Sequence, residues 1–160
     1  MKNSDYFSNY FSHLHNRLQT ADKKDLAKAT QLALNTNQQK RKVIVVGNGG
    51  SAAMASHVTV DFTKSVGIRA VNFNEADLLT CFANDYGYEN WVVEAIKANL
   101  NKNDMIILIS SSGTSKNIIN AARYCKKNSI KSITFSGFNK NNPLTKLGLV
   151  NFHVNSNQYN

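Results

Sequence analysis

One arrangement of residues occurs twice in this chain and constrains its fold more than any other feature. A short aliphatic run passes into a turn rich in glycine or serine, and a helical pattern follows, over 43–57 (VIVVGNGGSAAMASH) and over 105–118 (MIILISSSGTSKNI). Continuous apolar runs of this length are typical of parallel strands buried on both faces. When such strands alternate with helices of about ten to fifteen residues, we expect an α/β fold with a parallel sheet between helical layers.

The apolar periodicity predicts the other elements around these two units. Helical spacing runs through the first forty residues, in two segments followed by a polar break at 36–40. We expect Ser51 to cap the helix after the first turn. The predicted strands are 43–46, 70–73, 105–109, 132–135 and an edge strand at 152–154, and the later helices are 52–64, 77–83, 88–99 and 116–127.

Length and composition favour one globular domain over residues 1–160, with a helical segment at 1–40 and the α/β core at 41–160. We expect a cytoplasmic protein, because the chain has no apolar run that would act as a leader or cross a membrane. Its two cysteines, Cys81 and Cys125, lack metal spacing and fit reduced thiols. The net charge of +9 lies in short basic runs without interleaved aromatics. This pattern favours a solvated surface or an anionic substrate over nucleic acid.

Both turns are candidates for binding an anion. In a doubly wound sheet they lie at the carboxyl edge, where backbone N–H groups at a helix N-terminus favour phosphate. Neither turn has a complete dinucleotide or P-loop signature, so we expect no nucleotide cofactor. The second turn carries hydroxyls at Ser110, Ser111, Ser112 and Ser115, which suit a phosphate monoester. Ordinary tight turns with capping serines are the alternative.

The sequence resembles the SIS (sugar isomerase) family, and within it the phosphoheptose isomerases. Three segments carry the resemblance: GNGGSAAMASH at 47–57, FANDYGYE at 82–89 and ILISSSGTSKN at 107–117. It implies a flavodoxin-like three-layer αβα sandwich, with N-terminal helices that pack in a homo-oligomer, a tetramer or a dimer. It also implies that the loops after the strands bind a sugar phosphate. The implied substrate-binding residues are Asn48, Gly49, Gly50, Ser51, Asn84, Asp85, Ser110, Ser111, Ser112 and Ser115.

The implied catalytic residues are His57 and Asp61, which are four residues apart and share one helix face. In the isomerases that the chain resembles, the pair is His and Glu; both bind a metal ion in metal-containing members, and the Glu is the proposed base. The same two residues are therefore candidate ligands here, with zinc as the metal. Isomerisation of a ketose to an aldose needs a base and a group that stabilises the enediolate. Asp61 is one methylene shorter than the expected Glu.

A C-terminal helix supplies Gln and His to the site in the family. The chain ends at Asn160, where that helix would begin, so we expect the helix to be missing and an apolar face to be uncovered. Gln158 is too near the end to replace the missing ligand, and His153 is expected to be a surface or packing residue.

Two functions follow from the resemblance. The first is a ketose–aldose isomerase acting on sedoheptulose 7-phosphate or a similar sugar phosphate, with a product for the heptose of surface polysaccharide. The second is a non-catalytic sugar-phosphate-binding protein that regulates or binds a partner. The Asp at position 61 and the missing helix favour the second function for the chain as it stands.

Overall fold

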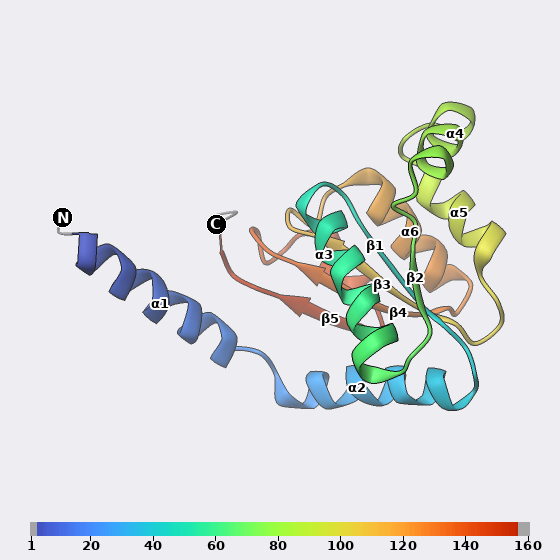
Figure 1. The fold of residues 1–160 in the computed structure, drawn as a ribbon. Helices are drawn as coiled ribbons and strands as arrows, with labels where there is room; N and C mark the ends of the chain where they lie inside the picture. Colours follow the sequence, from blue (N-terminus) through green and yellow to red (C-terminus); the bar gives the residue numbers. More distant parts are fainter. Residues whose placement is uncertain (1–2, 157–160) are drawn as a thin grey trace.

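A computed structural model describes residues 3–156 as a five-stranded sheet with helices on both faces (Figure 1). The elements, in chain order, are α1 (Asn3–Gln19), α2 (Lys23–Gln38), β1 (Val43–Gly47), α3 (Gly50–Val60), the π-helical turn η1 (Asp61–Val66), β2 (Ala70–Asn72), α4 (Ala76–Tyr86), α5 (Trp91–Asn99), β3 (Met105–Ser110), α6 (Lys116–Lys127), β4 (Lys131–Ser136), the 3₁₀ turn η2 (Pro143–Lys146) and β5 (Val150–His153).

All strand pairs are parallel, and their order is β2-β1-β3-β4-β5. From β1 the chain adds β2 on one side and then returns to add β3 on the other. This reversal is the topological switch point at which open α/β sheets bind their ligands. Gly47 at the end of β1 pairs with Ile109 near the end of β3, so the turns after these strands lie side by side.

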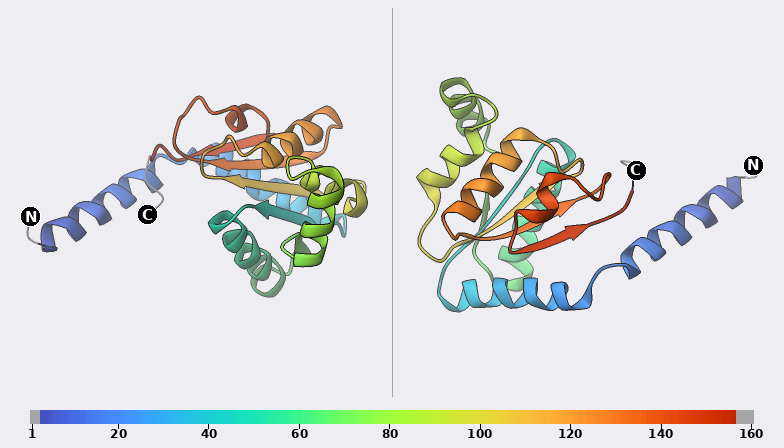
Figure 2. Two further views of the ribbon diagram at one scale, coloured as in Figure 1. Left: turned by 90° about the horizontal axis from the view of Figure 1, so that it is seen from above. Right: turned by 180° about the vertical axis from the view of Figure 1, so that it is seen from behind.

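The core has two halves because successive side chains of each strand point to opposite faces. Ile44 and Val46 of β1 pack with α5 and α6, whereas Val43 and Val45 pack with α2, α3 and η1. All four side chains are fully buried. Figure 2 shows the helices on the two sides of the sheet. The three-layer αβα sandwich expected from the sequence is confirmed.

The structure corrects two expectations about the helices that precede and follow β1. The polar break predicted at 36–40 is wrong at its start, because α2 continues to Gln38 and buries Thr36. The hydroxyl of Thr36 donates to the carbonyl of Leu32 at 2.8 Å, which lets a polar residue sit inside the helix. The helix predicted over 52–64 begins earlier, at Gly50, and changes to a π-helical turn at Asp61.

Other boundaries also differ from the predictions. Gly49, and not Ser51, is the N-cap of α3, and no side chain caps this helix. The helix predicted over 88–99 begins only at Trp91, because Gly87 ends α4 and residues 88–90 form a turn. The last strand is found at Val150–His153, at the sheet edge as expected but two residues earlier than its predicted start.

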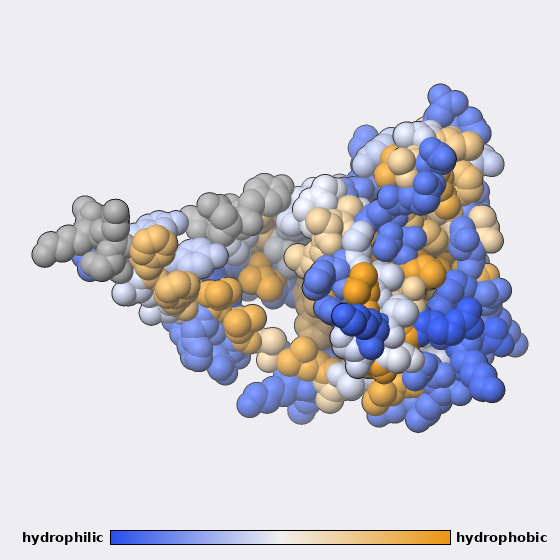
Figure 3. Space-filling model, viewed as in Figure 1, coloured by the Kyte–Doolittle hydropathy of each residue, from blue (hydrophilic) through white to orange (hydrophobic). Residues whose placement is uncertain are grey.

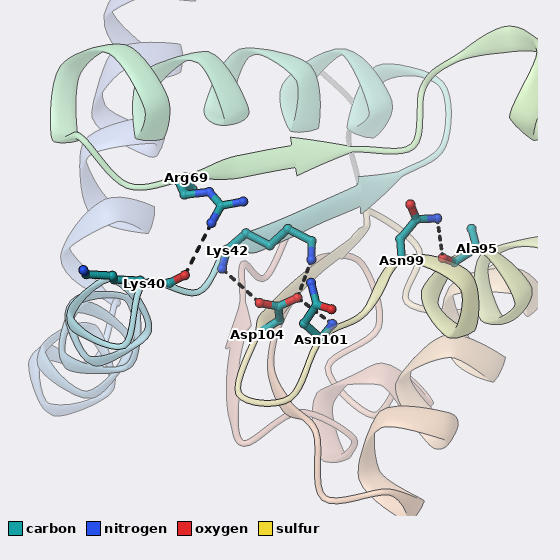
Figure 4. A network of polar contacts seen from close by, with 7 residues as sticks. All are labelled: Lys40, Lys42, Arg69, Ala95, Asn99, Asn101 and Asp104. Atoms are coloured by element: carbon teal, nitrogen blue, oxygen red, sulfur yellow. Dashed lines mark hydrogen bonds and ion pairs between the residues drawn. The ribbon is translucent and has the colours of Figure 1, made fainter.

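A buried ion pair joins the amino ends of β1 and β3, at the edge of the sheet opposite the two turns (Figure 4). Lys42 Nζ lies 2.6 Å from Asp104 Oδ2, and the Asp104 side chain is 1% exposed. The backbone N–H groups of Lys42 and Asn101 also donate to this carboxylate. Burial by itself would raise the pKa of Asp104, but the hydrogen bonds from Lys42 and Asn101 outweigh it and lower the pKa.

Helix α1 extends away from the body of the domain (Figures 1 and 2). Apolar side chains gather along it (Figure 3), and the residues of this α1 stripe are exposed: Tyr6, Phe7, Tyr10, Phe11, Leu14 and Leu18. No helix within residues 3–156 is long and apolar enough to cross a membrane.

An apolar groove of about 240 Å³ lies on the sheet face that carries α2 and η1. Ala33, Phe62, Ile107 and Phe135 are among its lining residues. Phe135 is 39% exposed and stacks on Phe152 of β5 with ring centroids 4.9 Å apart. The described residues therefore leave part of this apolar face uncovered.

Candidate functional site

The turn after β1 presents the start of α3 to the carboxyl edge of the sheet. A side chain at Gly47 would collide with the backbone of Ser51, since a Cβ there would lie 2.6 Å from the Ser51 carbonyl carbon. Glycine therefore lets the first turn of α3 pack directly against the end of the strand. Gly49 and Gly50 are exposed, whereas Ser51 is buried at 9% exposure. The exposed backbone of this turn is available to a ligand.

The turn after β3 is a compact loop of hydroxyl groups, which we call the serine loop (residues 110–115). Ser110 Oγ donates to Ser115 Oγ at 3.1 Å, and the backbone N–H and hydroxyl of Thr114 both donate to Ser112 Oγ. Helix α6 starts directly after Ser115, which makes no side-chain cap of its own. The helix N-terminus and the hydroxyls together form a site suited to an anion.

A reciprocal pair of amides joins the turn after β1 to the start of α6, just beyond the serine loop. Asn48 Nδ2 donates to Asn117 Oδ1, and Asn117 Nδ2 donates to Asn48 Oδ1, both at 2.9 Å. Asn117 is 1% exposed, and its Oδ1 also accepts from the backbone N–H of Ile118. The Tyr88 hydroxyl donates to Asn48 Oδ1 at 3.3 Å. The side-chain amide of Asn48 therefore holds the first turn against α6, and its expected contact with substrate stays a prediction.

Asn117 and Tyr88 were not among the residues expected from the sequence. Both lie inside or next to segments that carried the resemblance, at the ends of 107–117 and 82–89. An amide two residues after the hydroxyl-rich turn was the available signal for Asn117. Its partner, 69 residues earlier in the chain, could be identified only from the fold.

His57 and Asp61 lie together on the outer side of α3. The distance from His57 Nε2 to Asp61 Oδ1 is 3.8 Å, and the two side chains are 80% and 57% exposed. Asp61 is the first residue of the π-helical turn η1. Such turns occur often at functional sites because they change the direction of side chains along a helix. The spacing expected from the sequence is present, but both groups face solvent.

The described residues do not complete a zinc site. A catalytic zinc is held by three protein ligands. Within residues 3–156, no group of three or more His, Cys, Asp or Glu side chains could hold a metal ion. His57 and Asp61 supply only two ligands, so the residues present do not fit the metal by themselves.

Asn84 and Asp85 lie near the end of α4, exposed and in contact with each other. Asn84 Nδ2 donates to Asp85 Oδ1 at 2.9 Å, and the Cys81 thiol lies 3.6 Å from Asp85 Oδ2. The negative charge of Asp85 raises the pKa of Cys81, with smaller contributions from burial and from this hydrogen bond. Among the described contacts, no hydrogen bond joins Asn84 or Asp85 to either turn. Tyr88 is the residue of this segment that reaches Asn48.

A cavity of about 540 Å³ adjoins the carboxyl edge of the sheet, where the turns after β1 and β3 lie. Ser51 lines it from the start of α3, Ser111 from the serine loop, Ser136 from the end of β4 and Phe138 from the loop after β4. Helix α1 forms its outer wall, with Tyr10, His13, Leu14 and Arg17. Sequence reasoning placed Ser136 at the end of a strand but assigned none of these α1 residues to the site. The only indication in the sequence was that the helical spacing of these residues places them on one face of a helix.

Comparison with known proteins identifies the family. A model of the SIS domain matches residues 5–137. The phosphoheptose isomerase of Helicobacter pylori (strain ATCC 700392 / 26695) is 34% identical over 133 residues, which cover 78% of this chain and 69% of the relative.

Solved structures share the fold. The phosphoheptose isomerase of Neisseria gonorrhoeae superposes with a TM-score of 0.84 at 23% identity, over 99% of this chain and 87% of that one. The NanR protein of Vibrio vulnificus, complexed with ManNAc-6P, superposes with a TM-score of 0.69 at 19% identity, over 91% of this chain and 48% of that one. The match of the family model over most of the chain, supported by the Helicobacter relative, shows that this protein belongs to the SIS domain family.

Proposed function

We propose that this protein is a phosphosugar isomerase that interconverts sedoheptulose 7-phosphate, or a closely similar ketose phosphate, with an aldose phosphate. One observation carries the proposal: the turn after β1 is hydrogen-bonded to the start of α6, just beyond the serine loop, at the switch point of the sheet. The curated relative named phosphoheptose isomerase supports the same chemistry. The product would serve heptose synthesis, in the cytoplasm.

The serine loop binds the phosphate group in this proposal. The hydroxyls of Ser111, Ser112 and Ser115 and the first N–H groups of α6 are donors that a phosphate dianion accepts well. Ser111 and Ser112 are partly exposed, so an anion can reach them from solvent. The exposed backbone at Gly49 and Gly50 faces the sugar, while the Asn48–Asn117 pair holds the turn after β1 against the start of α6.

Asp61 is the base in this proposal. Its carboxylate accepts the proton from the hydroxyl-bearing carbon next to the carbonyl and returns it to the former carbonyl carbon, while the hydroxyl proton passes through water to the former carbonyl oxygen, so ketose and aldose interconvert without change of composition. His57, 3.8 Å away, orients Asp61. An exposed base works poorly in open water, because solvent competes with the substrate and weakens electrostatic interactions. The proposal therefore requires a cover over α3.

Incubation of the protein with sedoheptulose 7-phosphate, with and without added zinc, tests the isomerase. We expect the aldose product in a chromatographic or coupled assay, and weaker substrate binding in the double variant Ser111→Ala, Ser112→Ala. Ser65→Ala, at an exposed serine within the π-helical turn η1, is the matched control. Undiminished binding by the double variant would refute the role of the serine loop.

A non-catalytic sugar-phosphate-binding protein is the second candidate. The exposure of His57 and Asp61 and the incomplete ligand set favour it. The solved structure of NanR with ManNAc-6P shows that a protein of this fold binds a phosphosugar. Calorimetric binding of the sugar phosphate without any turnover, in the presence of zinc, would select this candidate over the isomerase.

The α1 stripe supports a homo-oligomer as part of the same proposal. Four of its side chains, Tyr6, Phe7, Phe11 and Leu18, are 55–68% exposed. A contiguous apolar surface of this kind on an extended helix is typical of a protein–protein interface. A second copy would bury its own stripe at the same contact, as in an isologous interface. We propose a dimer or tetramer formed through α1.

Phe7→Asp combined with Phe11→Asp should lower the oligomeric mass to that of one chain, because two charges in the contact are costly to desolvate. Light scattering after size-exclusion chromatography measures this mass. Ser12→Asp with Asn16→Asp, which adds the same charge on the opposite face of α1, should leave the mass unchanged. A wild-type protein of single-chain mass would contradict the proposal.

A further inference from the structure

The side chain of Asn142 lies buried at the base of the serine loop, although it comes from a different part of the chain. It is 3% exposed and precedes the 3₁₀ turn η2, whose backbone N–H at Leu144 donates to its Oδ1 at 3.1 Å. Its Nδ2 lies within hydrogen-bonding distance of three acceptors: Ser136 Oγ at 3.2 Å, the Gly137 carbonyl at 3.2 Å and the Asn139 carbonyl at 2.7 Å. One amide therefore joins the end of β4 to the first residues of the loop that follows it.

The same amide supports the middle of the serine loop. Gly113 has a left-handed backbone with φ of +65°, and a Cβ added there would lie 2.0 Å from Asn142 Oδ1. No side chain fits between the two, so the backbone of Gly113 packs closely against the Asn142 amide. Ser112 and Thr114, which flank Gly113, are the pair joined by hydrogen bonds within the loop.

A second link runs between the same two loops. The backbone N–H of Gly137 donates to the carbonyl of Ser111 at 2.8 Å, and the carbonyl of Gly137 accepts from Asn142. Asn142 thus acts on the serine loop in two ways: through packing under Gly113, and through the position of Gly137 beside Ser111.

We propose that Asn142 is a positioning residue for phosphate binding. It fixes the serine loop against the end of β4, so that the hydroxyls and N–H groups of the loop stand ready for the anion. This inference rests on the proposed function, because it assigns a role toward the phosphate of the sugar phosphate. In catalytic sites a misplacement of about 1 Å can cost about 100-fold in rate, and we expect donors preorganised for an anion to be similarly sensitive to their position.

The variant Asn142→Ser distinguishes the support of the serine loop by Asn142 from its other role as the N-cap of η2. Serine is also a good N-cap, so it can still accept from the Leu144 N–H. It cannot fill the space under Gly113 or reach the acceptors that the longer amide bridges. We expect the dissociation constants for sedoheptulose 7-phosphate and for inorganic phosphate to rise about 10- to 100-fold. KM should rise with these constants, while kcat should stay within about threefold of the wild-type value. This is the pattern expected when an interaction is lost that binds the substrate and the transition state equally.

Asn151→Ser is the matched control. Asn151 lies on β5, and its amide also makes three hydrogen bonds, with Thr134 and with the two backbone groups of Gly148. None of these contacts touches the serine loop, so the dissociation constants should match those of the wild type. Urea unfolding of both variants checks that the comparison is made between folded proteins.

The outcomes separate this inference from the proposed function. Wild-type protein that binds neither ligand in calorimetry would refute the proposed function, and the role of Asn142 with it. Wild-type binding that Asn142→Ser leaves unchanged would refute only the inference. If Asn142→Ser does not fold, Asn142→Asp, which keeps the cap and the volume but lacks the amide donor, takes its place with the same expected rise in both dissociation constants.

Discussion

Asp104→Ala is expected to lower the free energy of unfolding by about 3–5 kcal/mol, because it leaves the ammonium group of Lys42 buried without its partner. Lys42 Nζ lies 2.6 Å from Asp104 Oδ2, and the two side chains are 12% and 1% exposed. The same carboxylate accepts two backbone N–H groups, at Lys42 and Asn101, which would also lose their acceptor. Urea denaturation followed by circular dichroism measures the change.

The effect should depend on pH with a definite sign. The pKa of Asp104 is lower in the folded protein than in the unfolded chain, where an aspartate titrates at about 3.9. Its contribution to stability is therefore fully present above about pH 5 and is lost as the pH falls through the folded pKa. The difference between wild type and Asp104→Ala should shrink over that acidic range.

Glu94→Ala provides the control for this pair. It removes a carboxylate from an ion pair with Lys97 at 2.7 Å, where the side chains are 26% and 47% exposed. Solvent-exposed pairs contribute little, so the change should be small and should disappear in high salt. An Asp104→Ala effect no larger than that of Glu94→Ala would show that the buried pair does not hold β1 and β3 together.

Asp61→Asn is expected to lower kcat for the proposed isomerisation by about 10²–10⁴-fold, the usual contribution of a general base. An amide cannot accept the proton, but it keeps the size of the side chain, so KM should change little. Steady-state assays with sedoheptulose 7-phosphate give both constants. Asp77→Asn on α4, exposed and outside the candidate site, should leave both unchanged.

The conservative variant Asp61→Glu gives a second, opposite expectation. It restores the longer side chain that the resemblance led us to expect, and the base would then reach about 1 Å further. Because a misplacement of that size can cost about 100-fold in rate, Asp61→Glu should raise kcat above the wild-type value. If Asp61→Asn keeps full activity, Asp61 is not the base.

The layers of the fold could be predicted because they depend on local patterns. The continuous apolar runs of β1 and β3 lie in fully buried strands, and the periodicity of 116–127 matches α6, with Ile118, Ile119, Ala122 and Cys125 buried. Burial also raises the pKa of Cys125 to about 12, so this thiol behaves as an apolar core residue. The π-helical turn at Asp61 was not predictable, because no sequence pattern distinguishes it from another turn of α-helix.

The candidate site was predicted in its outline but not in its connections. Each turn can be recognised by its own glycines and serines, since the chemistry lies within a few residues. The contacts that hold the turns join distant residues: Asn48 with Asn117, and Asn142 with Gly113. In the sequence, each of these three asparagines is indistinguishable from an ordinary loop or helix residue. Only the fold shows which residue it contacts.

The reciprocal bonds between Asn48 and Asn117 also limit how the sequence can evolve. Each side-chain amide donates an N–H to the carbonyl oxygen of the other. The pair therefore forms only when both side chains carry a donor and an acceptor and have the same length. Aspartate at one position would set two acceptors against each other, and glutamine would be too long. A viable change at either position needs a compensating change at the other, so the two should be inherited as a unit across 69 residues of chain.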